Sequence, residues 1–189
     1  MANKTTWQLD PAHTNTEFSA KHMMFTTVRG HFTDLSGTIR VDEEDPSRSS
    51  VEVEIDASSL DTGVEDRDNH LRSGDFLDVE NHPKLVFKSK RVEGSPREPG
   101  DRFKVIGDLT IRGNTHEVTL EAEYQGRGPD PWGGERTGFS ASTTIDRRDW
   151  GLTWNKALEA GGILVSNEVK IELDVQAVKE TEKEKQEAA

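Results

Sequence analysis

Hydrophobic and polar residues alternate along many short stretches of this chain. In residues 51–56 an apolar side chain stands at every second position, and a carboxylate follows each of them. Because strand side chains point alternately to two faces, this pattern predicts half-buried antiparallel strands. The alternation is strict over residues 51–56, 118–124 and 169–175, and weaker over residues 7–9, 16–21, 35–41, 85–92, 103–111 and 139–145.

Turn residues separate these stretches. The sequence Arg112-Gly113-Asn114-Thr115 places two residues that tolerate positive φ, Gly113 and Asn114, between two alternating runs, which predicts a tight hairpin. Further breaks fall at residues 45–48, 94–100 and 126–134, each of which contains proline. About eight strands separated in this way indicate an all-β sandwich or barrel.

One stretch, DRDNHLRSGDFLDVENHP at residues 66–83, interrupts the strand pattern. Thr62 and Glu65 fit a capping box, and Gly74 is placed to end a helix in a left-handed conformation. Three- and four-residue spacing puts four side chains on one face of that helix: Val64, Arg67, His70 and Leu71. This face is narrow and only partly apolar. Residues 62–76 are therefore predicted to form a rim segment across an opening, with Phe76 and Leu77 turned inward.

Composition narrows the functional classes. The 189 residues suit one domain over residues 1–178, followed by a charged tail, residues 179–189, that is disordered or a frayed helix. The 36 acidic and 24 basic residues give a formal charge of -12, which repels nucleic acid and anionic lipid surfaces. There is no cysteine and no apolar run long enough for a membrane span. We expect a soluble cytoplasmic protein, unless a leader was removed, with no nucleic-acid partner and no stable membrane insertion.

The sequence contains none of the common catalytic or metal-binding motifs. Residues 66–77 resemble a calcium loop, but leucine stands where the loop needs its glycine and its bidentate glutamate. The six histidines form no closely spaced pair, so a transition-metal site would need distant histidines to converge. No nucleophile elbow or phosphate loop is present. We expect no metal, no cofactor and no catalytic residue; the alternative is an enzyme that acts on a lipid through His22, His70 and nearby carboxylates.

The apolar residues carry more information. An aromatic and methionine-rich stretch, residues 18–25, is followed by Val28 and Phe32, and such side chains commonly fill a core. An eight-stranded barrel is either filled by its side chains or holds one small ligand. Several positions expected to face inward are small, which favours the ligand: Gly37, Gly107, Ala122, Ala141 and Thr143. The filled alternative predicts a lumen plugged by Trp150, Trp154 and the phenylalanines.

Several motifs in a fixed order give the chain a resemblance to a known family. They are LDPAHT at residues 9–14 with Phe18 and His22, VRGHF at 28–32, RDNHLRSGDFLD at 67–78, HPK at 82–84 leading into FKS at 87–89, GDLTI at 107–111 and DWGLTWN at 149–155. Over residues 7–178 the chain resembles the YceI-like family of lipocalin-like, lipid-binding proteins. The resemblance implies an extended eight-stranded antiparallel β-barrel with a short helix and helical turns near one end. It also implies a polyisoprenoid or other long-chain lipid in the lumen.

These observations predict a protein that carries, stores or sequesters a long-chain amphiphile of the prenyl quinone or prenyl phosphate type, and not an enzyme. Strand alternation assigns the candidates for the lumen wall: Phe18, Met23, Phe25, Phe32, Phe76, Phe87, Leu109, Phe139, Trp150 and Trp154. The rim segment and the first strands supply the candidates for contact with a polar head: His13, His22, Arg67, Asn69, His70 and Arg72. The expected partner is a hydrophobic small molecule, and homodimerisation is left open.

Overall fold

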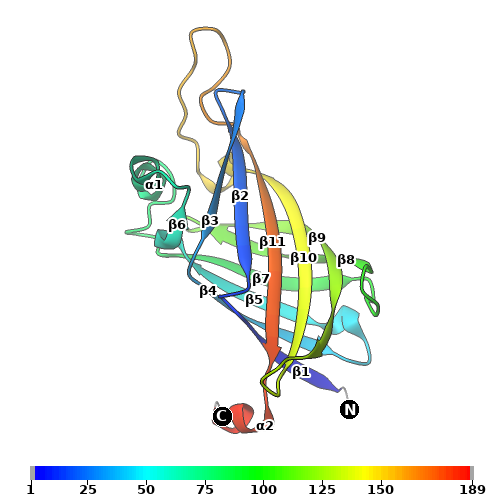
Figure 1. Cartoon of the computed structure of the whole chain (residues 1–189). Coiled ribbons are helices and arrows are strands. Elements are labelled where there is room, and N and C mark those ends of the chain that lie inside the picture. The colour runs from blue at the N-terminus through cyan, green and yellow to red at the C-terminus, as the bar shows by residue number, and fades with distance from the viewer. Residues whose placement is uncertain (1–2, 188–189) are drawn as a thin grey trace.

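The computed structural model describes residues 3–187. In this part of the chain eleven strands form one antiparallel sheet, in the order β1-β4-β5-β7-β8-β9-β10-β11-β2-β3-β6 (Figure 1). The strands are β1 (Lys4–Leu9), β2 (Asn15–His22), β3 (Thr26–Phe32), β4 (Leu35–Asp42), β5 (Ser50–Asp56), β6 (Leu60–Asp61), β7 (Lys84–Glu93), β8 (Arg102–Ile111), β9 (Asn114–Pro129), β10 (Glu135–Asp146) and β11 (Glu168–Lys179). The helical elements are α1 (Glu65–Arg72), α2 (Glu182–Glu187) and the short 3-10 helices Pro46–Arg48, Ala57–Ser59 and Arg147–Trp150.

Strand β1 closes the sheet into a barrel. It pairs with β4 through residues 4–8 and with β11 through residues 7–9. Eight strands therefore form a closed ring: β1, β4, β5, β7, β8, β9, β10 and β11. The predicted all-β, eight-stranded antiparallel barrel is confirmed. Closure pairs the backbone groups that an open sheet would leave exposed along its edges.

Strands β2, β3 and β6 extend the wall beyond this ring. β11 is longer than β1, and its residues 170–174 pair with β2 instead. Strand β3 follows β2 in a hairpin, and its last two residues pair with β6. The sequence pattern missed β3 because Gly30 interrupts its alternation. A side chain at Gly30 would place its Cβ 2.4 Å from Cζ of Phe18, so the glycine makes room for that ring.

Helix α1 forms where the sequence predicted a helix, but the predicted caps are wrong. The N-cap residue is Val64, which makes no side-chain cap hydrogen bond, and the helix ends before Ser73 without a left-handed glycine at position 74. Thr62 instead donates its backbone N–H to Oδ1 of the buried Asp68 at 2.9 Å, and its hydroxyl also donates to that oxygen. The carboxylate of Asp68, one turn into the helix, thus accepts hydrogen bonds from the backbone N–H and the hydroxyl of the segment that leads into the helix.

Two predictions about glycines are corrected by the structure. In the β8–β9 hairpin the positive φ angles belong to Arg112 (49°) and Gly113 (73°), not to Gly113 and Asn114, because Ile111 pairs directly with Asn114. Gly37 and Gly107 do not make room for a ligand. A Cβ at Gly37 would lie 2.7 Å from Cδ1 of Leu9, and one at Gly107 would lie 2.7 Å from Cζ of Phe87, so neighbouring side chains already occupy both positions.

The two ends of the barrel carry different elements. Figure 1 shows α1 beside the β2–β3 hairpin, and the orange segment between residues 152 and 167 projecting beyond the same end. The helical turns Ala57–Ser59 and Arg147–Trp150 lie toward this end with α1, whereas the helical turn Pro46–Arg48 follows β4 at the other end of the barrel. Within the predicted charged tail, β11 continues through Lys179 and α2 follows; residues 188–189 lie outside the described part.

Candidate functional site: the barrel cavity

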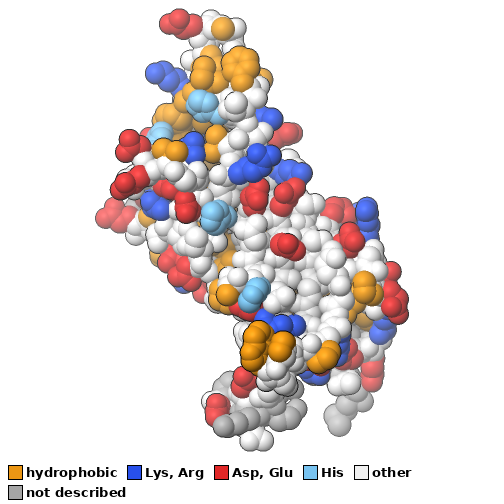
Figure 2. Space-filling model, viewed as in Figure 1, with side chains coloured by type: hydrophobic (Ala, Val, Ile, Leu, Met, Phe, Trp, Pro, Cys, Tyr) orange, Lys and Arg blue, Asp and Glu red, His pale blue; other side chains and the backbone are white. Residues whose placement is uncertain are grey.

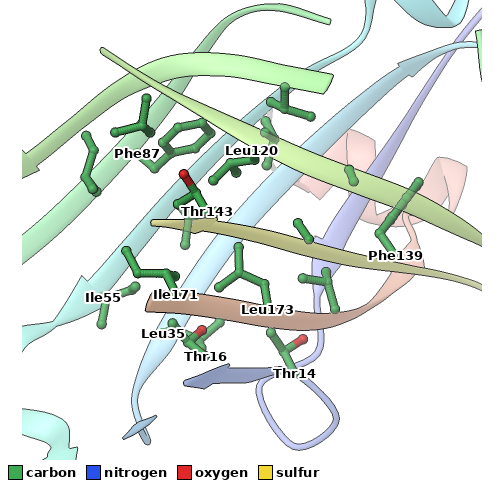
Figure 3. A pocket seen from close by; sticks show the side chains of 18 of the residues that line it. Thr14, Thr16, Leu35, Ile55, Phe87, Leu120, Phe139, Thr143, Ile171 and Leu173 are labelled. Atoms are coloured by element: carbon green, nitrogen blue, oxygen red, sulfur yellow. The ribbon is translucent and has the colours of Figure 1, made fainter. Parts of the chain in front are cut away.

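A cavity of about 480 Å³ lies inside the barrel. Figure 3 shows side chains from several strands pointing into it, among them Phe87, Leu120 and Ile171. Where a wall strand is regular, it contributes every second residue, as its alternation requires. Strands β10 and β11 illustrate this, since they line the cavity with Phe139, Ala141, Thr143 and Ile145, and with Val169, Ile171, Leu173 and Val175.

The interior is not filled by the protein's own side chains. Phe139, Ile171 and Leu173 point into the barrel yet remain half-exposed, whereas a close-packed core would bury them. The volume also falls within the roughly 300–1,000 Å³ of typical small-molecule sites. The alternative of a lumen plugged by tryptophan and phenylalanine side chains is therefore wrong.

The structure places six of the predicted lumen residues on the cavity wall: Phe18, Phe32, Phe76, Phe87, Leu109 and Phe139. Leu77, predicted to turn inward, also lines the cavity. These positions follow from strand alternation for the residues of β2, β7, β8 and β10, whereas Phe32 lies on β3, which the sequence pattern missed. Phe76 and Leu77 reach the wall from the segment that follows α1.

The other four predicted lumen residues lie elsewhere, so their assignment is wrong. Met23 and Phe25 are 39% and 81% exposed, because residues 23–25 form the turn of the β2–β3 hairpin, where alternation stops. Trp150 is buried outside the cavity wall and donates its Nε1–H to the carbonyl of Leu109 at 2.8 Å. Trp154 packs between rings of the α1 end.

An aromatic cluster joins α1 to the segment after β10. The ring of Trp154 lies 4.6 Å from the ring of His70 and 5.3 Å from the ring of Phe76. His70 and Phe76 are themselves 5.1 Å apart, edge to face. Because Phe76 and Leu71 line the cavity, this cluster covers one end of it.

Most of the predicted head-group residues of the rim segment are engaged with the protein itself. Arg67 donates to the hydroxyl and the carbonyl of Thr62, each at 2.7 Å. Arg72 donates to the carbonyls of Ser58 and Leu60 and to the side chain of Asn69. Arg67 and Arg72 hold α1 on the neighbouring backbone, Asn69 orients Arg72, and none of the three lines the cavity. Their contact with a ligand head stays a prediction.

The predicted histidines do not come together. His13 lies just before β2 and His22 is its last residue, so these two head-group candidates lie at opposite ends of the strand and cannot both join the rim segment. Nδ1 of His13 lies 2.7 Å from Oδ2 of Asp10, near the β1 end of the barrel, and His22 bridges to Val165 at the α1 end. His70 pairs with Asp75 at 2.9 Å on the exposed side of α1. None of the three lines the cavity.

Sequence reasoning missed Arg147, a buried cation on the cavity wall. Its guanidinium donates to four backbone carbonyls, those of Leu152, Trp154, Val165 and Ser166. Within residues 3–187 it forms no salt bridge with a carboxylate. Burial lowers the pKa of Arg147, because the water that would solvate its charge is removed, and the nearby Asp146 opposes this shift. Arginine remains charged even so.

Charged residues also line the cavity toward the β4–β5 connection. Arg127 forms a salt bridge with Glu43 at 2.9 Å and another with Glu135 at 2.8 Å. Arg97 donates to the carbonyls of Glu43 and Glu44. Arg127 and Arg97 thus have protein acceptors, carboxylates for the first and backbone carbonyls for the second. Over the described residues, no group of three or more histidine and acidic side chains could hold a metal ion.

Comparison with known proteins identifies the family. A model of the YceI-like domain matches residues 7–177. The chain belongs to the YceI-like family. A UPF0312 protein of Staphylococcus epidermidis is 38% identical over 169 residues, which cover 89% of this chain and 94% of the relative. A UPF0312 protein of Pectobacterium atrosepticum is 41% identical over 141 residues, which cover 75% and 71%. The resemblance inferred from the motifs is confirmed.

Solved structures share the YceI-like fold. The YCEI protein of Campylobacter jejuni superposes with a TM-score of 0.72 at 30% identity, covering 86% of this chain and 90% of that one. BcnA of Burkholderia cenocepacia gives a TM-score of 0.76 at 21% identity, with coverage of 89% and 98%. A polyisoprenoid binding domain from Saccharophagus degradans, implicated in plant cell wall breakdown, gives 0.66 at 13% identity, with coverage of 94% and 98%.

The YceI-like motif at residues 149–155 has a structural explanation in this chain. Trp150 anchors the turn to β8, and Gly151 adopts a φ of 79° that permits the chain to reverse. The side-chain amide of Asn155 donates to the carbonyl of Val165 and its oxygen accepts from the backbone N–H of Val165. The motif therefore holds the projecting segment on the barrel. No helix in the described residues has the length and apolar character to cross a membrane.

Proposed function

We propose that this YceI-like protein binds a long-chain amphiphilic lipid, a polyisoprenoid, in the barrel cavity and carries, stores or sequesters it. The observation that carries the proposal is the unfilled cavity of about 480 Å³ with an apolar wall. Water in such a cavity would find few hydrogen-bond partners, whereas a hydrocarbon chain would restore the contacts that a packed core provides.

The expected gain is large enough for stable binding. A tail that buries about 300 Å² of apolar surface would contribute on the order of 7 kcal/mol before the costs of ordering are subtracted. A smooth apolar wall discriminates weakly between hydrocarbon tails. The choice of a polyisoprenoid is supported by the structural neighbour from Saccharophagus degradans, which is described as a polyisoprenoid binding domain.

We further infer that the polar head of the lipid lies at the α1 end of the cavity. Arg147 supports this, because it is a cation on the cavity wall without a salt bridge to a carboxylate in the described residues. An anionic head would give this guanidinium a charged partner in addition to the backbone carbonyls that hold it. Prenyl phosphate should then bind more tightly than the prenyl alcohol of equal chain length.

Binding is favoured over catalysis by the positions of the candidate groups. The His70–Asp75 pair would have to face the lipid to act as an acid or base. Both residues lie outside the cavity wall, and their side chains are 39% and 51% exposed. His22 also lies outside the wall.

The direct test is to identify what the protein holds. Native mass spectrometry of freshly purified protein should reveal a bound long-chain lipid, and solvent extraction should release it. The delipidated protein should then bind added prenyl quinone or prenyl phosphate with one molecule per chain. A protein that is free of lipid after purification and ignores both additions would contradict the proposal.

A further inference from the structure

The end of the molecule beyond α1 carries an exposed apolar surface, which we call the apolar tip. It consists of the β2–β3 turn, residues 23–25, and the neighbouring segment, residues 156–164. Met24 and Phe25 are 64% and 81% exposed, and Met23 is 39% exposed. Figure 2 shows hydrophobic side chains gathered at this end of the molecule. Exposed apolar clusters of this kind are typical of surfaces that bind a partner.

The backbone holds the two parts of the apolar tip together. The N–H of Met23 donates to the carbonyl of Leu164 at 2.8 Å, and His22 forms a β-bridge with Val165. A Cβ at Gly162 would lie 2.6 Å from Sδ of Met24, so the two segments are in close contact. The tip is thus one continuous surface.

The turn presents its methionines at a conformational cost. Met23 and Met24 have φ angles of 51° and 65°, in the left-handed region that favours glycine and asparagine. Glycine or asparagine would relieve this cost and would also remove apolar surface from water. The presence of two methionines and a phenylalanine indicates that their apolar side chains are needed.

Charge distinguishes the apolar tip from the rest of the molecule. The apolar tip, residues 23–25 and 156–164, contains one lysine, Lys156, and one acid, Glu159, so its formal charge is zero. The whole chain carries -12. The tip is therefore an end of the molecule that can approach lipid phosphates without the repulsion expected of the acidic barrel surface.

The apolar tip is continuous with the cavity. Ala20 and Val165 line the cavity; Ala20 lies shortly before the hairpin turn, and Val165 directly follows residues 156–164 of the tip. A lipid that enters or leaves at this end would pass directly between the tip and the cavity wall.

We propose that the apolar tip docks on a phospholipid surface, with Met24 and Phe25 entering the interface between head groups and acyl chains. Peripheral docking of this kind needs apolar side chains at the interface and no membrane span. If the proposed lipid binding holds, docking lets the lipid move between membrane and barrel without crossing bulk water.

The test measures binding to vesicles of phosphatidylcholine. The full chain should float with the vesicles. The double variant Met24→Ser/Phe25→Ser should bind the vesicles at least about tenfold more weakly, because its interfacial apolar area is lost. Trp132→Ser is the matched control. Trp132 is 78% exposed but lies in the β9–β10 turn, at the end where Arg136 pairs with Val178, opposite the apolar tip.

A transfer assay separates docking from lipid binding. The rate at which delipidated protein takes a fluorescent farnesyl lipid from phosphatidylcholine vesicles should fall about tenfold in the double variant, in step with its weaker partition. Its affinity for the same lipid in detergent should equal that of the wild type. Vesicle binding without farnesyl lipid binding would sink the proposed function and leave docking intact.

Three results would overturn the docking proposal. The first is a double variant that binds vesicles as well as the wild type. The second is a Trp132→Ser variant that loses as much binding as the double variant. The third is a wild-type dimer that ignores vesicles and becomes monomeric in the double variant, which would make the apolar tip a contact between two copies of the chain.

Discussion

Filling the cavity with one side chain tests where the lipid binds. Ala141 lies on β10 and pairs with Ala122 of β9 and Leu173 of β11, and all three side chains line the cavity. Ala141→Phe would place a phenyl ring in space that the lipid tail is proposed to occupy. The backbone there is regular strand, which accepts phenylalanine readily.

The size of the effect follows from the volume of the ring. If each of the ring's carbons displaces one methylene of the lipid tail, at roughly 0.8 kcal/mol each, the binding free energy falls by about 5 kcal/mol. The tail can bend past part of the ring, so we expect a loss of at least about 2 kcal/mol, which weakens binding roughly 30-fold. The free protein should not lose stability, because filling a cavity commonly adds about 0.5–2 kcal/mol.

Two measurements on the delipidated protein check this prediction. Titration with a prenyl quinone gives the affinity, and urea unfolding without lipid gives the stability. Ser142→Phe is the control, since Ser142 is the next residue of β10, belongs to the outward face and does not line the cavity. Wild-type affinity in the Ala141→Phe variant, with normal stability, would show that the lipid does not occupy this part of the barrel.

Three further changes test the forces that shape the site and its support. Arg147→Met leaves the carbonyls of Leu152, Trp154 and Ser166 without their donor, whereas the carbonyl of Val165 keeps the amide of Asn155. Since each orphaned group costs about 1–3 kcal/mol, urea unfolding should show a loss of about 3 kcal/mol or more in the free energy of unfolding. A loss below about 1 kcal/mol would contradict the role assigned to the guanidinium. The hydrogen bond from Arg136 lowers the pKa of Asp10 from 3.8 to about 2, so the ionised carboxylate stabilises the fold above pH 3.8 and this contribution disappears as the pH falls to about 2. The stability difference between the wild type and Asp10→Asn should therefore be present above pH 3.8 and shrink as the pH falls to about 2 in urea titrations; a difference that grows over this window would refute the assignment. Gly107→Ala would bring a Cβ within 2.5 Å of the carbonyl oxygen of Lys88 and should lower the free energy of unfolding by about 2 kcal/mol. The control Gly128→Ala, whose Cβ would have no atom within 4 Å, should leave the free energy of unfolding nearly unchanged. Equal thermal unfolding of the two variants would show that the close approach at Gly107 does not prevent a side chain there.

The sequence alone determined the strands of the closed ring and the faces of those strands. Alternation has a period of two residues, so it can be read from a short stretch without knowledge of the rest of the chain. This is why Phe87, Leu109 and Phe139 could be assigned to the inner face from sequence, and why Glu121 or Glu172 could be assigned to the outer one. The order of the motifs was sufficient to indicate the family, which the comparisons confirm.

Only the tertiary structure decided what lies at each end of the barrel. Arg147 reaches the cavity wall because the turn after β10 folds back and meets carbonyls up to nineteen residues away, which no local pattern encodes. Phe25 leaves the wall because a hairpin turn, not a strand, contains it. The space beside Gly37 and Gly107 is occupied by the side chains of Leu9 and Phe87, so a small residue in the sequence does not imply free space in the barrel. Alternation fixes which face a side chain takes, while closure of the sheet fixes which side chains meet across it, and that depends on the whole chain.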